Sequence, residues 1–318
     1  MLSDINSRDM VEAVKLGCDA MSRCFNDRDN YIPFFEANLR PRAELKFSRR
    51  HSESHVPGRH LNALLSAEDV LKLTISEDAI ESHTRAAFFS YSGPILLPLN
   101  REEESGPLTN FFPHNIREGF HALYALAKYR GSVKAREIAE QSIELIQLIW
   151  DPDGGWDKSQ LNGSRGIEFV GDDSFVLGIA RSIGPLVKYY RATGYREALN
   201  LAILLKEKAL RDIFDEEGSF RIATFGTHSH STTCTMSSLA QLADSTKDKE
   251  LMLRVKSFYE NGLWEIRDRF GYSIENADLV ARNSGRGEIN NSADILETAL
   301  ILGSWGNPQY YDDAERII

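Results

Sequence analysis

"IQLIWDPDGGWD", residues 146–157, decides the fold, because an apolar helical run ends there in an acidic turn with a glycine and an aromatic residue. The same pattern returns in "LRDIFDEEGSF" (210–220) and "LWEIRDRFGYS" (263–273). The anchoring glycines follow one another at intervals of 63 and 53 residues: Gly155, Gly218 and Gly271. Periods of this size are typical of stacked or circular arrays of helical hairpins.

Each repeat pairs a helix without charges with a helix that carries charges on one face. "STTCTMSSLAQLA" (231–243) is nearly uncharged, as expected of a helix enclosed by neighbours, and 247–269 has the one-sided charge of a surface helix. A ring of such inner and outer helices is an α/α toroid. We therefore predict an all-α fold of the six-hairpin type in a single domain, 1–318, with 1–55 as an N-terminal helix and loop.

The helix count predicts that this toroid is incomplete. About ten or eleven helices are expected where six hairpins need twelve, and the last segment, "NPQYYDDAERII" (307–318), has no C-cap signal. A missing helix leaves an apolar groove, so we expect either a homodimer or a missing C-terminal portion. The stretches 93–99 and 219–225 are expected to be extended, and Pro185 is expected to kink a helix that begins near Asp173.

Composition narrows the class of protein. The chain has 318 residues and a formal net charge of -10, which argues against nucleic-acid binding because phosphate recognition needs clustered cations. Its three cysteines form no CxxC pair and no disulfide framework. The N-terminus does not resemble a signal peptide, and no apolar run reaches the length of a membrane span. These features predict a cytoplasmic protein that does not bind membranes.

Polar residues recur where the inner helices begin. If these helices run parallel around a ring, their N-termini share one rim, and the polar residues there form one pocket. The predicted rim residues are Arg59, His60, His114, Asn115, Glu118, Asp172, Asp173, His228, His230, Glu288, Asn290 and Asn291. Histidine, asparagine, arginine and carboxylates pair well with hydroxyl groups, so the expected ligand is an oligosaccharide or glycoside.

Carboxylates from different inner helices suit glycoside cleavage, which needs one acid and one base or nucleophile about 5–10 Å apart. Asp172 fits the N-cap position directly after Gly171, which leaves Asp173 as the candidate catalytic residue, with Glu288 or Asp294 as its partner. A lyase or epimerase would instead use His228 or His230 with an acid, and Arg59 or Arg286 would hold a substrate carboxylate. A non-catalytic carbohydrate-binding or scaffold domain is the remaining alternative. Trp156 is expected either to stack on a sugar or to pack in its turn.

Zinc is the other interpretation of "HSH" (228–230). Zinc sites use three or four protein ligands, and no spacing selects which of His60, Asp173 or Cys234 would complete a site with His228 and His230. We therefore predict that the protein needs no metal and no other cofactor.

The helical hairpins, the glycine–aromatic turns and the polar rim resemble the six-hairpin glycosidase superfamily over residues 55–318. More loosely, they are similar to its beta-L-arabinofuranosidase-like and uronic-acid-acting members. "PGRHLNALL" (57–65) resembles the Gly-Arg-aromatic-Leu stretch of such domains, with His60 in the aromatic place. Within 55–318 the only cysteine is Cys234, so the arabinofuranosidase site of three cysteines and a glutamate is absent. "DPDGGW" also resembles a terpene cyclase turn, but their Asp-x-Asp-Asp motif has only a partial match in "GDDS" (171–174).

Overall fold

The computed structural model describes residues 9–38, 40–279 and 286–318. The chain folds into two compact units. Unit 1 comprises the described residues up to Ala139 together with Leu161–Phe169; unit 2 comprises Glu140–Gln160 and the described residues from Val170 onward. None of the helices in the described ranges has the length and apolar character needed to span a membrane.

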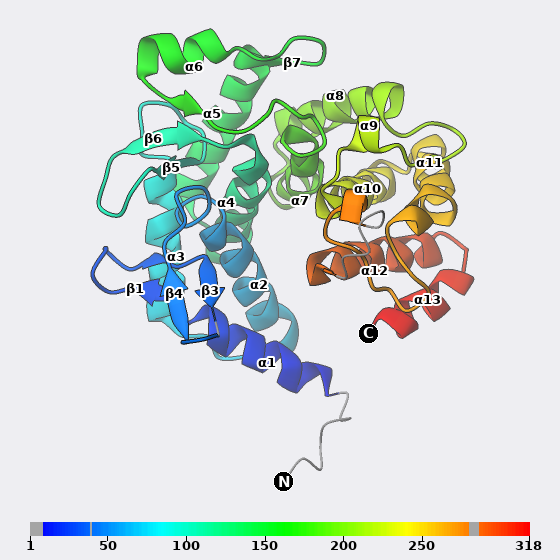
Figure 1. Ribbon diagram of the computed structural model, residues 1–318, viewed down its shortest axis with the longest axis horizontal. Coiled ribbons are helices and arrows are strands. Elements are labelled where there is room, and N and C mark those ends of the chain that lie inside the picture. Colours follow the sequence, from blue (N-terminus) through cyan, green and yellow to red (C-terminus); the bar gives the residue numbers. More distant parts are fainter. Residues whose placement is uncertain (1–8, 39, 280–285) are drawn as a thin grey trace. The chain divides into compact units, whose positions relative to one another are not determined.

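Unit 1 is built on a small group of packed helices. Helices α2, α3 and α4 pack against one another, and α1 packs on α2 (Figure 1). Their bounds are Met10–Met21 (α1), Val56–Leu71 (α2), Glu77–Ser90 (α3) and Ile116–Arg130 (α4), the last preceded by the 3-10 helix η1 at Pro113–Asn115. Helices α5 (Val133–Ile149) and α6 (Lys158–Arg165) contribute residues to both units.

Short β-strands occur in the segments between helices. The antiparallel pairs are β1 (Phe25–Asn26) with β2 (Ile32–Pro33), β3 (Glu36–Asn38) with β4 (Glu44–Lys46), and, in unit 2, β7 (Trp150–Asp151) with β8 (Gly155–Trp156). A three-stranded sheet has the order β5 (Leu99–Arg101), β6 (Leu108–Phe111), β9 (Glu168–Phe169), in which β6 and β9 are parallel. The parallel pair joins a distant segment to unit 1.

A buried ion cluster lies at β5. The Arg101 guanidinium donates from Nε to Glu53 Oε1 at 2.5 Å and from Nη1 and Nη2 to the Asp29 carboxylate at 2.9 and 2.5 Å. Hydrogen bonds from Arg101 hold the pKa of Asp29 below its usual value, whereas burial raises the pKa of Glu53 to about 7 although Arg101 opposes the rise. The arginine therefore compensates two carboxylates that water does not reach.

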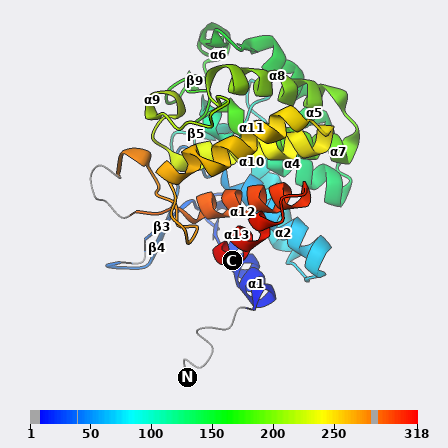
Figure 2. The same cartoon turned by 90° about the vertical axis from the view of Figure 1, so that its right-hand side faces the viewer.

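Unit 2 is a second group of packed helices. Helix α10 packs against α7, α11 and α12, while α8 packs on α7 and α13 on α12 (Figure 2). The bounds are Ile183–Thr193 (α7), Arg196–Asp212 (α8), Ile222–Phe225 (α9), Ser229–Thr246 (α10), Lys249–Glu260 (α11), Ile289–Ser304 (α12) and Gln309–Ile317 (α13), with 3-10 helices η2 (Ile179–Ser182), η3 (Gly262–Glu265) and η4 (Ala277–Leu279).

Helix α10 is the inner helix that the sequence predicted. Fourteen of its 18 residues are buried, many of them serine and threonine. Some of its hydroxyl groups bond within the helix, as when Thr235 Oγ1 donates to the Ser231 carbonyl at 2.8 Å, and others bond to carboxylates of α12, as when Thr233 Oγ1 donates to Asp294 Oδ2 at 3.0 Å. Its neighbour α11 buries only its apolar face. The hairpin α10–α11 therefore confirms the predicted division into inner and outer helices.

The three anchoring glycines of the repeat have left-handed backbone conformations. Gly155, Gly218 and Gly271 have φ of 72°, 68° and 81°, a region that strongly favours glycine. At Gly218 a Cβ would lie 2.3 Å from the Ser257 carbonyl group, so no side chain fits. Each of these turns follows the end of a helical segment: α5, α8 or η3.

Some sequence predictions of local structure are wrong. The helix expected from Asp173 begins only at Ile183 as α7, so Pro185 lies in its first turn, where a missing N–H breaks no helical hydrogen bond and causes no kink. Asp172 is not the N-cap of this helix: its Oδ1 accepts a bond from Ser174 N at 3.3 Å in a loop. The end of 219–225 is not extended but forms α9, closed by Gly226 N donating to Ile222 O at 2.8 Å. In 93–99, only Leu99 belongs to a strand.

Candidate functional site

In unit 1, a buried carboxylate, Glu118, collects the predicted polar residues around the start of α4. Glu118 Oε1 accepts a bond from Arg117 Nη1 at 3.0 Å and lies 3.5 Å from Arg59 Nε. Its Oε2 lies 3.5 Å from His55 Nδ1. We call His55, Arg59, Asn115, Arg117 and Glu118 the Glu118 cluster. Two guanidinium groups compensate a carboxylate whose side chain is fully buried.

Stacked imidazole and phenyl rings extend the Glu118 cluster along η1. His55 Nδ1 and Asn115 Oδ1 are 2.9 Å apart, and Asn115 Nδ2 donates to the Arg50 carbonyl at 2.5 Å. The His55 ring stacks on His114 with an angle of 6° between the ring planes, and His114 in turn stacks on Phe112. The structure thus brings together Arg59, His114, Asn115 and Glu118, which the sequence predicted as separate members of one rim.

The sequence reasoning missed His51 and His55. His51 lies edge-on to both His55 and His114 and bonds through Nδ1 to Ser48 Oγ at 3.0 Å. The signal was present, because the two histidines are four residues apart directly before "PGRH", and this spacing places them on one side of a helical turn.

In unit 2, two histidines and two carboxylates meet where α10 and α12 begin. His228 is the N-cap residue of α10, and Glu288 is the N-cap residue of α12. His228 Nε2 lies 3.5 Å from Glu288 Oε2, and His230 Nδ1 lies 3.3 Å from Glu288 Oε1. His230 Nε2 lies 3.4 Å from Asp294 Oδ2. We call these four residues the His228 cluster.

The chain between η3 and η4 holds the two helix starts together. Ser229 N donates to Glu275 O at 3.1 Å, and Glu288 N donates to Ser273 O at 3.2 Å. Asn291, also predicted as a rim residue, is buried in α12 and donates from Nδ2 to Ser273 Oγ and Ile274 O, both at 3.1 Å. This amide therefore fixes the segment on which the His228 cluster rests.

Side-chain hydrogen bonds orient the members of the His228 cluster. His228 Nδ1 is 2.8 Å from Ser231 Oγ, and Thr233 Oγ1 donates to Asp294 Oδ2 at 3.0 Å. Asn290 Nδ2 donates to Glu288 Oε1 at 2.7 Å. The predicted residues His228, His230, Glu288 and Asn290 therefore lie in one place.

The His228 cluster also has the donor atoms of a metal site. One ligand atom each from His228, His230 and Glu288 lies within 4.8 Å of the others. The sequence selected no third ligand for the two histidines, and the fold supplies Glu288 from a distant helix.

Asp172 and Asp173 lie in the loop before η2, and Trp156 lies in the β7–β8 hairpin. Asp173 Oδ2 accepts a bond from Trp156 N at 3.4 Å and lies 3.4 Å from Lys158 Nζ. Trp156 is buried, as a residue that packs its turn should be. Arg286 is exposed just before Glu288.

His60 does not face Glu118, although it follows Arg59 in α2. Its Nδ1 lies 3.6 Å from Cys24 Sγ and 3.2 Å from His83 Nε2. Burial, then His83 and Arg59, lower the pKa of His60 to about 3, and burial lowers the pKa of His83 to about 4. Both imidazoles are therefore neutral at neutral pH.

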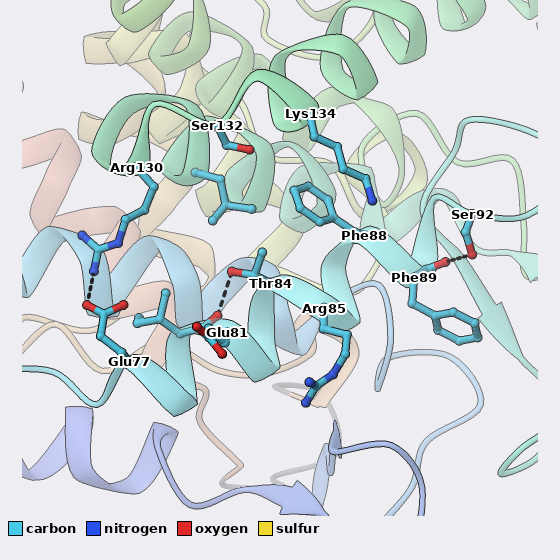
Figure 3. A pocket seen from close by; sticks show the side chains of 12 residues that line it. Glu77, Glu81, Thr84, Arg85, Phe88, Phe89, Ser92, Arg130, Ser132 and Lys134 are labelled. Carbon is cyan, nitrogen blue, oxygen red and sulfur yellow. Dashed lines mark hydrogen bonds and ion pairs between the residues drawn. The ribbon is translucent and has the colours of Figure 1, made fainter.

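The hollow shown in Figure 3 is lined by none of the predicted residues. It has a volume of about 710 Å³ and lies between α3 and the turn from α4 to α5. Arg130 closes one end through a 3.0 Å bond to Glu77, and Lys134 lies over the Phe88 ring at 4.6 Å (Figure 3). Its walls are mainly helical surface without the converging acids and imidazoles of the two clusters.

Comparisons with known proteins establish the fold. No protein-family model and no curated protein matches the chain. Among solved structures it is similar to a D-mannose isomerase (14% identity, covering 98% of this chain and 84% of that chain, TM-score 0.67). It is similar to a sugar epimerase from a ruminal bacterium (13% identity, 97% and 85%, TM-score 0.66) and to the unsaturated glucuronyl hydrolase of Bacillus sp. GL1 (13% identity, 96% and 82%, TM-score 0.65).

The chain has the α/α-toroid fold. The predicted fold class and the predicted resemblance to six-hairpin glycosidase-fold enzymes are thereby confirmed at the level of architecture. The described residues form thirteen α-helices where about ten or eleven were expected, and the short helices α6 and α9 were not among the expected ones.

Proposed function

We propose that this protein is a carbohydrate-active enzyme that acts on an oligosaccharide or glycoside, with the His228 cluster as its acid–base site. The observation that carries the proposal is the position of Glu288, whose two oxygens face two different imidazoles. The solved structures with the same fold include enzymes named for action on sugars, which supports this class of substrate.

Exposure divides the cluster into two roles. The side chains of Glu288 and His228 are 23% and 28% exposed, so both can reach a substrate. His230 and Asp294 are nearly buried and act as positioning residues, because each nitrogen of the His230 ring faces one carboxylate. In such a chain of hydrogen-bonding groups, the exposed end can exchange a proton with a substrate. The buried carboxylate at the other end stabilises the positive charge that an imidazole then gains.

Glycoside hydrolysis is the reaction that we propose first. It requires a second carboxylate besides Glu288, and we assign this part to Asp173, which the sequence favoured and which is more exposed than Asp294. One carboxylic acid would protonate the departing oxygen, and the other carboxylate would activate water or attack the anomeric carbon.

Epimerisation or isomerisation is the second candidate. The observation that favours it is that the partly exposed His228 lies beside Glu288, which His230 positions, since an imidazole and a carboxylate can remove a proton from a sugar carbon and return it without a second carboxylate. A lyase would use the same base to remove a proton next to a substrate carboxylate.

The test is turnover of a panel of aryl glycosides and reducing sugars in D2O by the wild type, Glu288→Gln and Glu297→Gln. Hydrolysis releases the aryl alcohol, whereas proton exchange introduces deuterium at carbon without cleavage. Glu288→Gln should lower kcat by about 10²–10⁴, because the amide cannot exchange a proton. Glu297, on the same helix but bonded to Ser237 and Gln241, is the matched control and should change turnover little.

Equal turnover by wild type and Glu288→Gln would contradict the assignment of the site. Sugar binding by a wild type that turns over nothing on the panel would favour the non-catalytic module.

A further inference from the structure

Unit 1 contains a compact group of metal-ligating atoms that the proposed function does not use. Cys24 lies between α1 and β1, His60 in α2 and His83 in α3. One ligand atom of each lies within 4.8 Å of the other two. Three elements separated in sequence thus point one soft donor and two imidazole nitrogens at a common position.

The separations of these atoms match the edges of a tetrahedral zinc site. Zn–N bonds of about 2.05 Å and Zn–S bonds of about 2.3 Å place two nitrogens about 3.3 Å apart, and a nitrogen and a sulfur about 3.6 Å apart. The structure has 3.2 Å between His60 Nδ1 and His83 Nε2, and 3.6 Å between His60 Nδ1 and Cys24 Sγ.

We propose that Cys24, His60 and His83 bind one zinc ion. A thiolate and neutral imidazoles are the donor set that zinc prefers over magnesium or calcium, which require oxygen ligands. The fourth position faces the Met21 carbonyl, which lies 3.4 Å from Cys24 Sγ and 3.0 Å from His83 Nε2. That oxygen or a water molecule completes the coordination.

A hydrogen-bonded group without metal is the alternative. In that arrangement the thiol and the His83 Nε2–H both donate to the Met21 carbonyl. His83 Nδ1 is buried without a hydrogen-bond partner in either arrangement, as an acceptor in the metal-free group and as an N–H when Nε2 binds zinc, so the spacing of the three ligand atoms is what favours the metal.

A zinc ion here would act on stability. It would join the end of α1 and the β1–β2 hairpin to α2 and α3, because Cys24 lies between α1 and β1, His60 in α2 and His83 in α3. Binding to the folded state alone raises the melting temperature. We expect the effect in the whole chain whether or not the protein processes sugars, so the proposal does not depend on the function of the His228 cluster.

The test begins with the full chain, stripped by a chelator and desalted, then reconstituted with Zn²⁺ and measured by elemental analysis. The wild type should hold one zinc per chain and melt at a higher temperature than the stripped protein. Cys24→Ser and His83→Ala should lose the zinc and the rise in melting temperature. Cys18→Ser, at another buried cysteine in α1, is the matched control and should keep both.

Cobalt separates this site from the His228 cluster and also covers the case in which a variant does not fold. Co²⁺ added to the stripped wild type should give a thiolate-to-cobalt charge-transfer band, because only a cysteine ligand produces one. The band should survive in Cys18→Ser, Cys234→Ser and His228→Ala. Absence of both zinc and the cobalt band in the wild type overturns the proposal, as does zinc that is lost in His228→Ala but kept in Cys24→Ser.

Discussion

Replacing Arg101 by methionine should destabilise unit 1 severely. The side chains of Arg101, Asp29 and Glu53 are 3%, 2% and 0% exposed, and the guanidinium makes three hydrogen bonds to the two carboxylates. Methionine fills much of the same space but leaves two buried carboxylates without a cation. Breaking a buried ion pair in this way costs about 3–5 kcal/mol, and we expect a loss in that range at pH 8.

The loss should depend on pH with a definite sign. Glu53 has a pKa of about 7 in the folded state, above its value in the unfolded chain, so its contribution to stability is present below the unfolded pKa and disappears as pH rises through 7. Without Arg101 nothing opposes the effect of burial, and the folded pKa rises further. The destabilisation of Arg101→Met should therefore be smaller at pH 5, where Glu53 binds a proton, than at pH 8.

The assay is urea unfolding followed by circular dichroism at both pH values. Arg130→Met is the control, because Arg130 also bridges two carboxylates, Glu68 and Glu77, but on the surface. Exposed ion pairs contribute about 0–1 kcal/mol, so its loss should stay below 1 kcal/mol at either pH. Equal losses in the two variants, or a larger loss for Arg101→Met at pH 5 than at pH 8, would refute the reasoning.

Two further predictions concern the backbone under Glu118 and the loop before η2. Gly58→Ala should cost about 1–3 kcal/mol in unfolding experiments, because its Cβ would lie 1.8 Å from the Glu118 carbonyl oxygen, whereas Gly17→Ala, with open space around it, should be neutral or slightly stabilising; a Gly58→Ala variant as stable as wild type would contradict this. If Asp173 supplies the second carboxylate of a glycosidase, Asp173→Asn should lower kcat by about 10²–10⁴ with little change in melting temperature, and Asp172→Asn should do much less; equal kinetics for wild type and Asp173→Asn would exclude that role.

The sequence predicted those parts of the fold that depend on local periodicity. Inner helix α10 and its charged neighbour α11 follow from side-chain pattern, and glycines mark the turns of the repeat because their backbone can adopt positive φ. The late start of α7 was missed because the apolar run after Asp173 continues through a turn and a 3-10 helix, which periodicity does not distinguish from an α-helix. The parallel pairing of β6 with β9 depends on contacts far apart in sequence.

For the candidate sites, too, the sequence predicted local features but not the contacts between segments far apart in the chain. Polar residues at helix starts could be recognised one helix at a time, and the rule found His228, His230 and Glu288 before any of their distances were known. Asp294 was noted only as a possible partner carboxylate, and its contact with His230 requires the packing of α12 on α10. The grouping of Cys24 with His60 and His83 was not predicted, because 36 and 23 residues separate the contacting pairs and no motif has that spacing.

Helix α10 is buried largely through serine and threonine, whose short side chains lose little conformational entropy when they are ordered. They also let backbones approach, so that a methyl group at Gly184 of α7 would lie 2.8 Å from Ser238 Oγ. A longer side chain along α10 has little free volume to relax into, so we expect the helix to shift as a rigid rod and to displace its N-terminal histidines from the carboxylates of α12. Natural variation should therefore be tolerated far less along α10 than along α11, even at positions several turns from His228 and His230.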